Sequence, residues 1–352
     1  MYLKILPFNK TLFKKDCNMV KIIAFLLAAI LFVSVTFYVL SRFNSLKNLE
    51  KYYTEEGIEY NRDDIIEGYR DSIIWRLTDE EVMAVLLVLV SICLVAILFG
   101  EEKRNRTFEV LSVMPYTKYE IFFNKLLAAL LAIVLPFVIN GLIMILALGV
   151  SPNLRIFYSA KQILVWMLSN IYYGLPIFSF SLIFGVITGT TISQVILTGI
   201  FLIFPVGFPL LIAYNLELWG LRTFSFNAIL DKVADYSLKG VFYKPYEGFK
   251  YYIFYILLSI IMIIISKILF DKNKIERNRE TLEFEKTEGF FTVGVSVCTA
   301  LLMALITTGF FNSFISISKF SNILIILIGY ILGGALGYFV AQFSIKVNQS
   351  KA

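Results

Sequence analysis

Residue types that usually carry enzymatic chemistry are scarce in this sequence. None of its 352 residues is a histidine, which removes the most common general base and every Ser-His or Cys-His arrangement. No G-x-x-x-x-G-K-[ST] segment occurs, so the chain lacks the usual phosphate loop for ATP. The cysteines, Cys17, Cys93 and Cys298, are far apart in apolar surroundings and form no disulfide framework or metal-ligand pattern. We therefore expect no catalytic residue, no metal site and no cofactor bound by this chain.

Charged residues are also missing from the centres of the apolar blocks, where the polar residues are Asn140, Asn170 and Gln194. Carriers driven by proton or ion gradients usually need a titratable or coordinating group near the middle of the membrane. This absence argues against such a carrier, so energy for any transport would have to come from another polypeptide.

One short charged segment, residues 101–125, stands out: EEKRNRTFEVLSVMPYTKYEIFFNK. Thr107 can cap a helical turn, and Phe108, Leu111 and Met114 then follow at helical spacing. Pro115 stops or redirects the chain before a second helical run begins at Tyr116. Together these pieces predict a compact helix parallel to the membrane whose apolar side chains can fill a groove on a partner. The alternative is a plain solvated loop.

At these residues the sequence resembles the permease subunits of type-2 ABC exporters. In that family the first cytoplasmic loop has a glutamate, a small residue, a helical E-x-L stretch, a proline, a basic residue and a lysine where the chain returns to the membrane. The matching residues here are Glu101, Thr107, Glu109, Leu111, Pro115, Lys118 and Lys125. Thr107 stands where glycine is frequent, and Tyr116 and Thr117 replace a common small or serine pair.

The resemblance implies that this loop is a coupling helix that docks into a separate ATPase. It also implies a cytoplasmic ABC ATPase that binds ATP and Mg, a second permease subunit that is identical or related, and a bacterial cytoplasmic membrane. The family core has six spans, and this chain adds two, as in a bacterial subgroup of these permeases.

The composition of the chain predicts an all-α polytopic membrane protein. Hydrophobic residues make up 58% and charged residues 16%, an imbalance too large for one water-soluble core. The apolar residues gather in blocks of about 17 to 25, the length that crosses the hydrocarbon layer as a helix. We expect eight spans in one transmembrane domain, residues 1–352: about 20–40, 82–99, 126–149, 163–187, 194–214, 251–270, 290–310 and 321–343.

The basic residues favour cytoplasmic termini, because short loops rich in lysine and arginine stay inside. The richest loops, 101–125 and 271–289, fall on the same side as both termini when eight spans are counted. The net charge of +6 is spread between apolar blocks, which favours membrane lipids as partners rather than nucleic acid.

Several connecting segments carry their own expectations. Residues 1–19 resemble an amphipathic interfacial helix before the first span, with a disordered basic tail as the alternative. Residues 41–81 predict a helical cap outside the membrane, and residues 215–249 a second outer loop. The two extra spans and the tail occupy residues 290–352.

Aromatic and amide side chains in the second to fifth spans suggest a path for amphiphilic cargo such as a lipid, a peptide antibiotic or a drug. The candidates are Asn140, Asn170, Tyr172, Tyr173, Phe178, Phe180 and Phe201.

Small residues recur at four-residue spacing, which allows two helices to approach closely. One set is Ser181, Gly185 and Gly189, and the other is Gly329, Gly333 and Gly337. Packing within the chain and a dimer interface are both open. The rivals to a permease are a carrier or channel that needs no ATPase, and a membrane sensor or scaffold.

Overall fold

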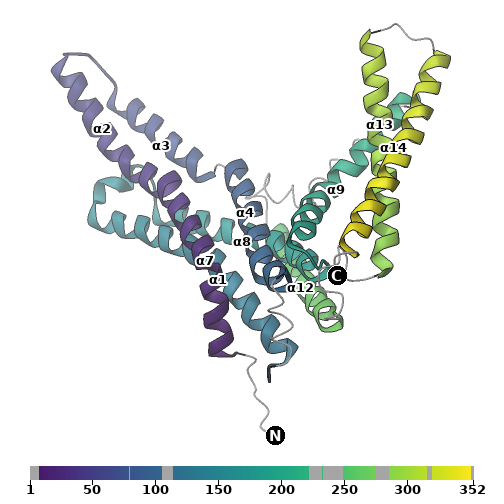
Figure 1. The fold of residues 1–352 in the computed structure, drawn as a ribbon. Coiled ribbons are helices and arrows are strands. Elements are labelled where there is room, and N and C mark those ends of the chain that lie inside the picture. The colour runs from purple at the N-terminus through teal and green to yellow at the C-terminus, as the bar shows by residue number, and fades with distance from the viewer. Residues whose placement is uncertain are drawn as a thin grey trace. The chain divides into compact units, whose positions relative to one another are not determined.

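The computed structural model describes residues 8–78, 80–104, 114–221, 232, 249–273, 285–314 and 319–349. Within these ranges the chain is helical and has no strand (Figure 1). Eight helical stretches are long and apolar enough to cross a membrane, which confirms the all-α, eight-span prediction. The stretches are Lys10–Glu55, Arg62–Glu101, Lys118–Val150, Ala160–Ile187, Thr191–Leu218, Ile253–Lys272, Glu288–Ser313 and Asn322–Phe343.

The contacts divide the chain into two compact units. Unit 1 comprises Met1–Leu98, Tyr116–Ser179 and Glu247–Ile263, and unit 2 comprises Phe99–Pro115, Phe180–Tyr246 and Ile264–Ala352.

Unit 1 is built on α1 (Lys10–Leu31), which packs along α7 (Lys118–Val150). The helix does not end at Leu31 but continues through a π-helical stretch, η1 (Phe32–Phe37), into α2 (Tyr38–Glu55). The amino-terminal segment therefore differs from its prediction: its described part is the first turns of the spanning helix itself and not a separate helix. Asn9 explains where it starts, because its side chain accepts hydrogen bonds from Thr11 N and Leu12 N.

Residues 41–81, which the sequence predicted as a cap, contain most of α2 and all of α3 (Arg62–Thr78), and these two helices lie side by side as a hairpin (Figure 1). Gly57, with φ of 63°, ends α2, and Ile58 N donates to Tyr53 O at 3.0 Å. Only a residue that tolerates the left-handed conformation closes a helix in this way. The rest of unit 1 follows as α4 (Glu80–Val95), the 3-10 turn η3 (Pro152–Ile156) and the parts of α8 and α12 named below.

The π-helical stretch is held by side chains from other helices of unit 1. Thr36 Oγ1 donates to Asn140 Oδ1 at 2.7 Å, and Arg76 Nε donates to Ser34 O at 2.8 Å. A π-turn breaks the regular hydrogen-bond ladder, and neighbouring side chains satisfy the backbone groups that this frees inside a membrane.

A second π-helical stretch, η2 (Ala96–Glu101), begins in unit 1 and ends in unit 2, where it leads into the short α5 (Glu102–Arg104). Unit 2 also holds α9 (Thr191–Leu218), α13 (Glu285–Phe314) and α14 (Lys319–Gln349). The helices α8 (Ala160–Ile187) and α12 (Phe249–Lys272) begin in unit 1 and end in unit 2. The two last helices run side by side along their length (Figure 1).

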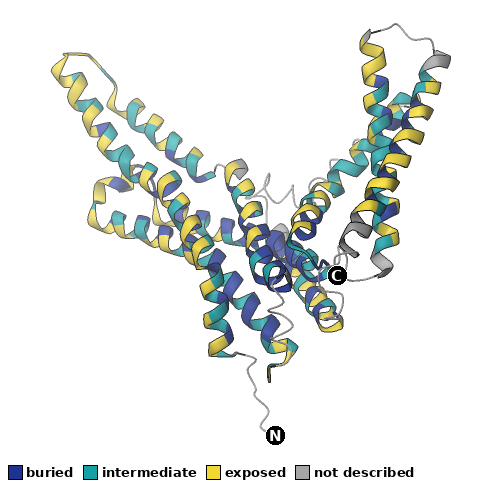
Figure 2. Cartoon of the chain, in the orientation of Figure 1, coloured by how far each residue is buried: buried dark blue, intermediate teal, exposed yellow. Residues whose placement is uncertain are grey.

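Exposed residues recur along the spans (Figure 2), and many of them have large apolar side chains. Ile331, Phe339 and Phe343 on α14, for example, are 69–71% exposed. Such a surface suits contact with lipid chains, and the chain is accordingly a multi-pass membrane protein.

Candidate functional site

The predicted coupling loop, residues 101–125, contains α5 at its start and the first turns of α7 at its end. Its central part, with Thr107, Phe108, Glu109 and Leu111, lies outside the described residues. The structure describes both ends of the loop, and each end is held in place by a buried lysine.

The second half of the loop starts α7 as the sequence predicted. Thr117 caps the helix: its Oγ1 accepts from Glu120 N at 3.1 Å, and Thr117 N donates to Glu120 Oε2 at 3.0 Å. Just before this cap, Met114 and Pro115 are exposed and Tyr116 is half-buried. Lys118 follows as the first residue of the helix. The short stretch from Met114 to Tyr116 therefore presents apolar surface next to a rigid helix start.

Lys103 fixes the first end of the loop within unit 2, where its side chain is only 1% exposed. Its ammonium donates to three backbone carbonyls at the end of α8: Gly185 O at 3.2 Å, Val186 O at 3.1 Å and Thr188 O at 2.8 Å. The last carbonyls of a helix have no partner in the helix and carry partial negative charge, so a buried cation is well placed there. Glu101 lies two residues earlier, at the end of η2, and is half-buried.

Residues near Lys103 in unit 2 pack closely against the turn between α8 and α9. Gly100 leaves no room for a side chain, because a Cβ there would lie 2.7 Å from Thr191 Oγ1 and 3.0 Å from Thr191 Cα. Asn273, just past α12, donates from Nδ2 to Val186 O at 3.2 Å. The turn between α8 and α9 is thus held by Lys103 from α5 and by Asn273 from the end of α12.

Lys125 fixes the second end of the loop within unit 1. The sequence placed it where the loop returns to the membrane, but the structure buries it, with 1% exposure. Its Nζ donates to Leu98 O at 2.5 Å and lies 3.8 Å from Asp16 Oδ1 on α1. The long lysine stem allows this, because the ammonium can reach inward from the first turns of α7. Lys125 therefore anchors the loop and is not part of its exposed surface.

The start of α1 is attached to the same place. Asn9 N donates to Asn124 Oδ1 at 3.2 Å, and Asn124 Nδ2 donates to Glu120 O at 2.7 Å. A displacement of the first turns of α7 would therefore be felt directly by α1.

The expected cargo-path residues fall into separate groups. Asn140 is 1% exposed and joins α7 to the first helix, since its Nδ2 donates to Ala28 O at 3.1 Å as well as to Pro136 O. Asn170 Nδ2 donates to Trp166 O on its own helix. Both amides are therefore engaged by backbone carbonyls, and Asn140 also joins two helices.

The aromatic candidates divide between the units. In unit 1, Tyr172 packs against Tyr173 and Tyr255, with ring centres 5.2 and 6.1 Å apart, and Phe178 is fully buried. In unit 2, Phe180 and Phe201 belong to a ladder of half-buried rings from α8 and α9. The ladder runs through Phe180, Phe184, Phe201, Phe204 and Phe208, with neighbouring centres 4.9 to 5.6 Å apart.

The two glycine sets have different outcomes. Gly329, Gly333 and Gly337 pack within the chain, because a Cβ at each would collide with α13; at Gly333 it would lie 2.4 Å from Thr299 O. The other set is corrected: α8 ends at Ile187, so Gly189 lies in the turn after the helix and cannot continue a stripe with Gly185. At this point Lys103 binds the last carbonyls of α8. Thr190 then caps the start of α9.

Sequence reasoning did not select Lys103 or Asp16, whose buried side chains hold the two ends of the loop. Each had a weak signal: Lys103 ends the acidic EEK triplet that follows an apolar block, and Asp16 is a single acid among the lysines before the first span. In the described part of the chain, no group of three Cys, Asp or Glu residues could hold a metal ion.

The family model described as "ABC-2 family transporter protein" matches residues 13–228. This range includes the whole loop and both of its buried lysines. The search of curated proteins and the search of solved structures each found no match.

Proposed function

We propose that this chain, which belongs to the ABC-2 family of transporter proteins, is the permease subunit of an ATP-driven exporter. Membership in the family and the eight apolar helices make it a transport component of a membrane. The finer assignment, export powered by a separate ATPase that docks on residues 101–125, is the proposal.

The observation that carries the proposal is how the two ends of the loop are attached to the helices around them. A segment that transmits force must be attached rigidly to the helices it moves. Lys103 attaches one end to the carbonyls of the α8–α9 turn, and Lys125 attaches the other to α1 through Asp16. Both attachments are charged and buried, so their contacts are not lost to competing water.

In the proposed cycle, ATP and Mg bind to the partner ATPase, and this chain supplies none of the nucleotide site. Closure of the ATPases would displace the loop, and the two lysine anchors would pass the movement to the spans. The nucleotide shifts the population of the two states only by its different affinity for them.

We propose an amphiphilic cargo. The ladder from Phe180 to Phe208 supports this, because half-buried aromatic rings offer apolar contact to a lipid, peptide antibiotic or drug. A second permease, identical or related, would complete the pathway, and a bacterial cytoplasmic membrane would be its location.

The test uses the permease co-expressed with an ABC ATPase encoded beside it. Glu109→Ala combined with Pro115→Ala should lower the co-purified ATPase about tenfold, the effect of losing an interface residue that contributes strongly to binding. The matched control is Glu59→Ala with Pro152→Ala, which changes the same residue types at exposed positions of unit 1.

The control pair should leave both co-purification and ATP turnover unchanged. If the loop pair behaves like the control pair, residues 101–125 do not dock on the ATPase.

A further inference from the structure

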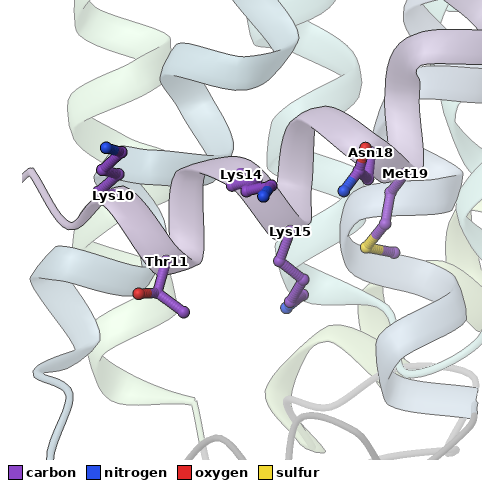
Figure 3. Close-up of a pocket in the computed structure, with 6 residues that line it drawn as sticks. All are labelled: Lys10, Thr11, Lys14, Lys15, Asn18 and Met19. Atoms are coloured by element: carbon purple, nitrogen blue, oxygen red, sulfur yellow. The ribbon is translucent and has the colours of Figure 1, made fainter.

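The first turns of α1 carry a row of basic and polar side chains that line an open hollow. The lining residues are Lys10, Thr11, Lys14, Lys15, Asn18 and Met19 (Figure 3). Lys10 and Lys14 are exposed, one helical turn apart, and neither ammonium has an ion-pair or hydrogen-bond partner among the described residues. Lys15 differs, because its ammonium lies 3.4 Å from Asp16 Oδ1. Among the described residues, therefore, no side chain compensates these two positive charges.

The row is held on a rigid surface. Leu12, Asp16 and Val20, on the other side of the helix, are buried, and α1 packs along α7. Figure 3 shows Thr11 and Lys15 projecting from the same side of the helix, one turn apart. The Thr11 hydroxyl, a hydrogen-bond donor, therefore lies beside the hollow that the exposed Lys10 and Lys14 also line, and charged donors of this kind bind anions.

The helix becomes apolar directly beyond the row. Lys21 is exposed, and next to it Ile22, Phe25 and Leu26 are 63%, 72% and 52% exposed. In a membrane protein such side chains lie against acyl chains, and lysines beside them extend toward the headgroups. The hollow therefore lies at the level where lipid phosphates are found.

We infer that the hollow binds the headgroup of an anionic phospholipid in the leaflet nearest the start of α1. The ammonium groups of Lys10 and Lys14 would contact the phosphate, Thr11 and Asn18 would donate hydrogen bonds, and an acyl chain would follow Ile22 and Phe25. The inference rests on the chain being a multi-pass membrane protein, and it stands or falls independently of the ATPase partner.

The test measures lipid retained by the purified full-length chain, by native mass spectrometry, with phosphatidylglycerol and phosphatidylcholine of identical acyl chains. Each lysine near a charged membrane surface contributes about fivefold in affinity, so Lys10→Gln with Lys14→Gln should weaken phosphatidylglycerol binding roughly 25-fold. Phosphatidylcholine binding should hardly change. Lys47→Gln with Lys161→Gln is the control, because both residues are exposed in unit 1 and the loss of charge is the same.

Circular dichroism of all variants checks that the helices form. Equal losses in the two double variants would mean that total charge alone attracts the lipid and would overturn the site. Equal retention of the two lipids by the wild-type chain would also overturn it. Displacement of the lipid by inorganic phosphate would identify a site for free anions in its place.

Discussion

At the residue scale, the two buried lysines show how a membrane protein can use charge without a catalytic purpose. A buried charge is costly unless it is paired and hydrogen-bonded. Lys103 meets this condition with three carbonyls, and Lys125 with one carbonyl and a carboxylate. Exchange of either lysine for an apolar residue of similar length would leave these acceptors buried without their cation.

The Asp16–Lys125 pair gives a direct prediction at this scale. Asp16→Asn and Lys125→Met should each destabilise the chain by about 2 kcal/mol, because each removes one charged partner of a buried group that keeps its other contact, Leu98 O for Lys125 and Lys15 for Asp16. The double variant should lose clearly less than the sum, since both single variants remove the same Asp16–Lys125 contact. Thermal unfolding in detergent measures all three variants against wild type.

Lys161→Met is the control for this cycle, since that lysine is exposed at the start of α8 and its loss should change stability by less than about 0.5 kcal/mol. Strictly additive effects of Asp16→Asn and Lys125→Met would show that the two side chains do not interact.

At the element scale, α13 and α14 form a helical hairpin that small residues hold together. Helices in a membrane gain little from the hydrophobic effect, so close packing and hydrogen bonds between helices must stabilise their contacts. The hairpin is also tied to α9: Tyr330 OH donates to Asn215 Oδ1 at 2.9 Å, and Asn215 Nδ2 donates to Leu301 O at 3.2 Å. These bonds join the two extra spans to α9 within unit 2.

Two adjacent glycines of α14 make a matched test of the hairpin. Gly333→Ala should destabilise it, because the added Cβ would lie 2.6 Å from Met303 Cβ and 2.8 Å from Ala300 Cα. Gly334→Ala should be neutral or stabilising by up to about 1 kcal/mol, since its nearest contact is Ala300 Cβ at 3.8 Å and alanine favours helix.

Thermal unfolding of the two variants in the same detergent provides the comparison. Equal stability of the Gly333 and Gly334 variants would mean that α13 and α14 do not pack through this stripe.

At the scale of the whole molecule, an even number of spans predicts that both ends of the chain lie on one side of the membrane. The basic loops 101–125 and 271–289 predict that this side is the cytoplasm. The proposed coupling depends on this orientation, because an ABC ATPase can reach only the cytoplasmic loops.

Cysteine labelling tests the orientation in a chain whose Cys17, Cys93 and Cys298 are replaced by serine. A membrane-impermeant maleimide should label Glu59→Cys and Asn153→Cys in intact cells. It should label Met114→Cys and Lys272→Cys only after the membrane is opened. All four positions are exposed. Labelling of Met114→Cys in intact cells would place the loop outside and exclude coupling to a cytoplasmic ATPase.

The sequence by itself determined the helices, the number of spans and the start of α7. These features depend on local properties: an apolar run of about 20 residues, a backbone that must bond to itself in lipid, and the Thr117–Glu120 capping pair. It also predicted the glycine stripe of α14, whose four-residue period is visible in the chain, but not whether its partner would be this chain or another.

Only the tertiary structure decided which residues the buried charges contact. Lys103 bonds to carbonyls 82 to 85 residues away, and Lys125 lies near an acid on the first helix. Backbone carbonyls are the same at every position, so no residue pattern marks those that will accept a lysine. Gly189 was assigned to a helix that in fact ends two residues earlier, at Ile187. Nothing in the local sequence indicated this end, because Lys103, which binds the last carbonyls of α8, comes from a distant part of the chain.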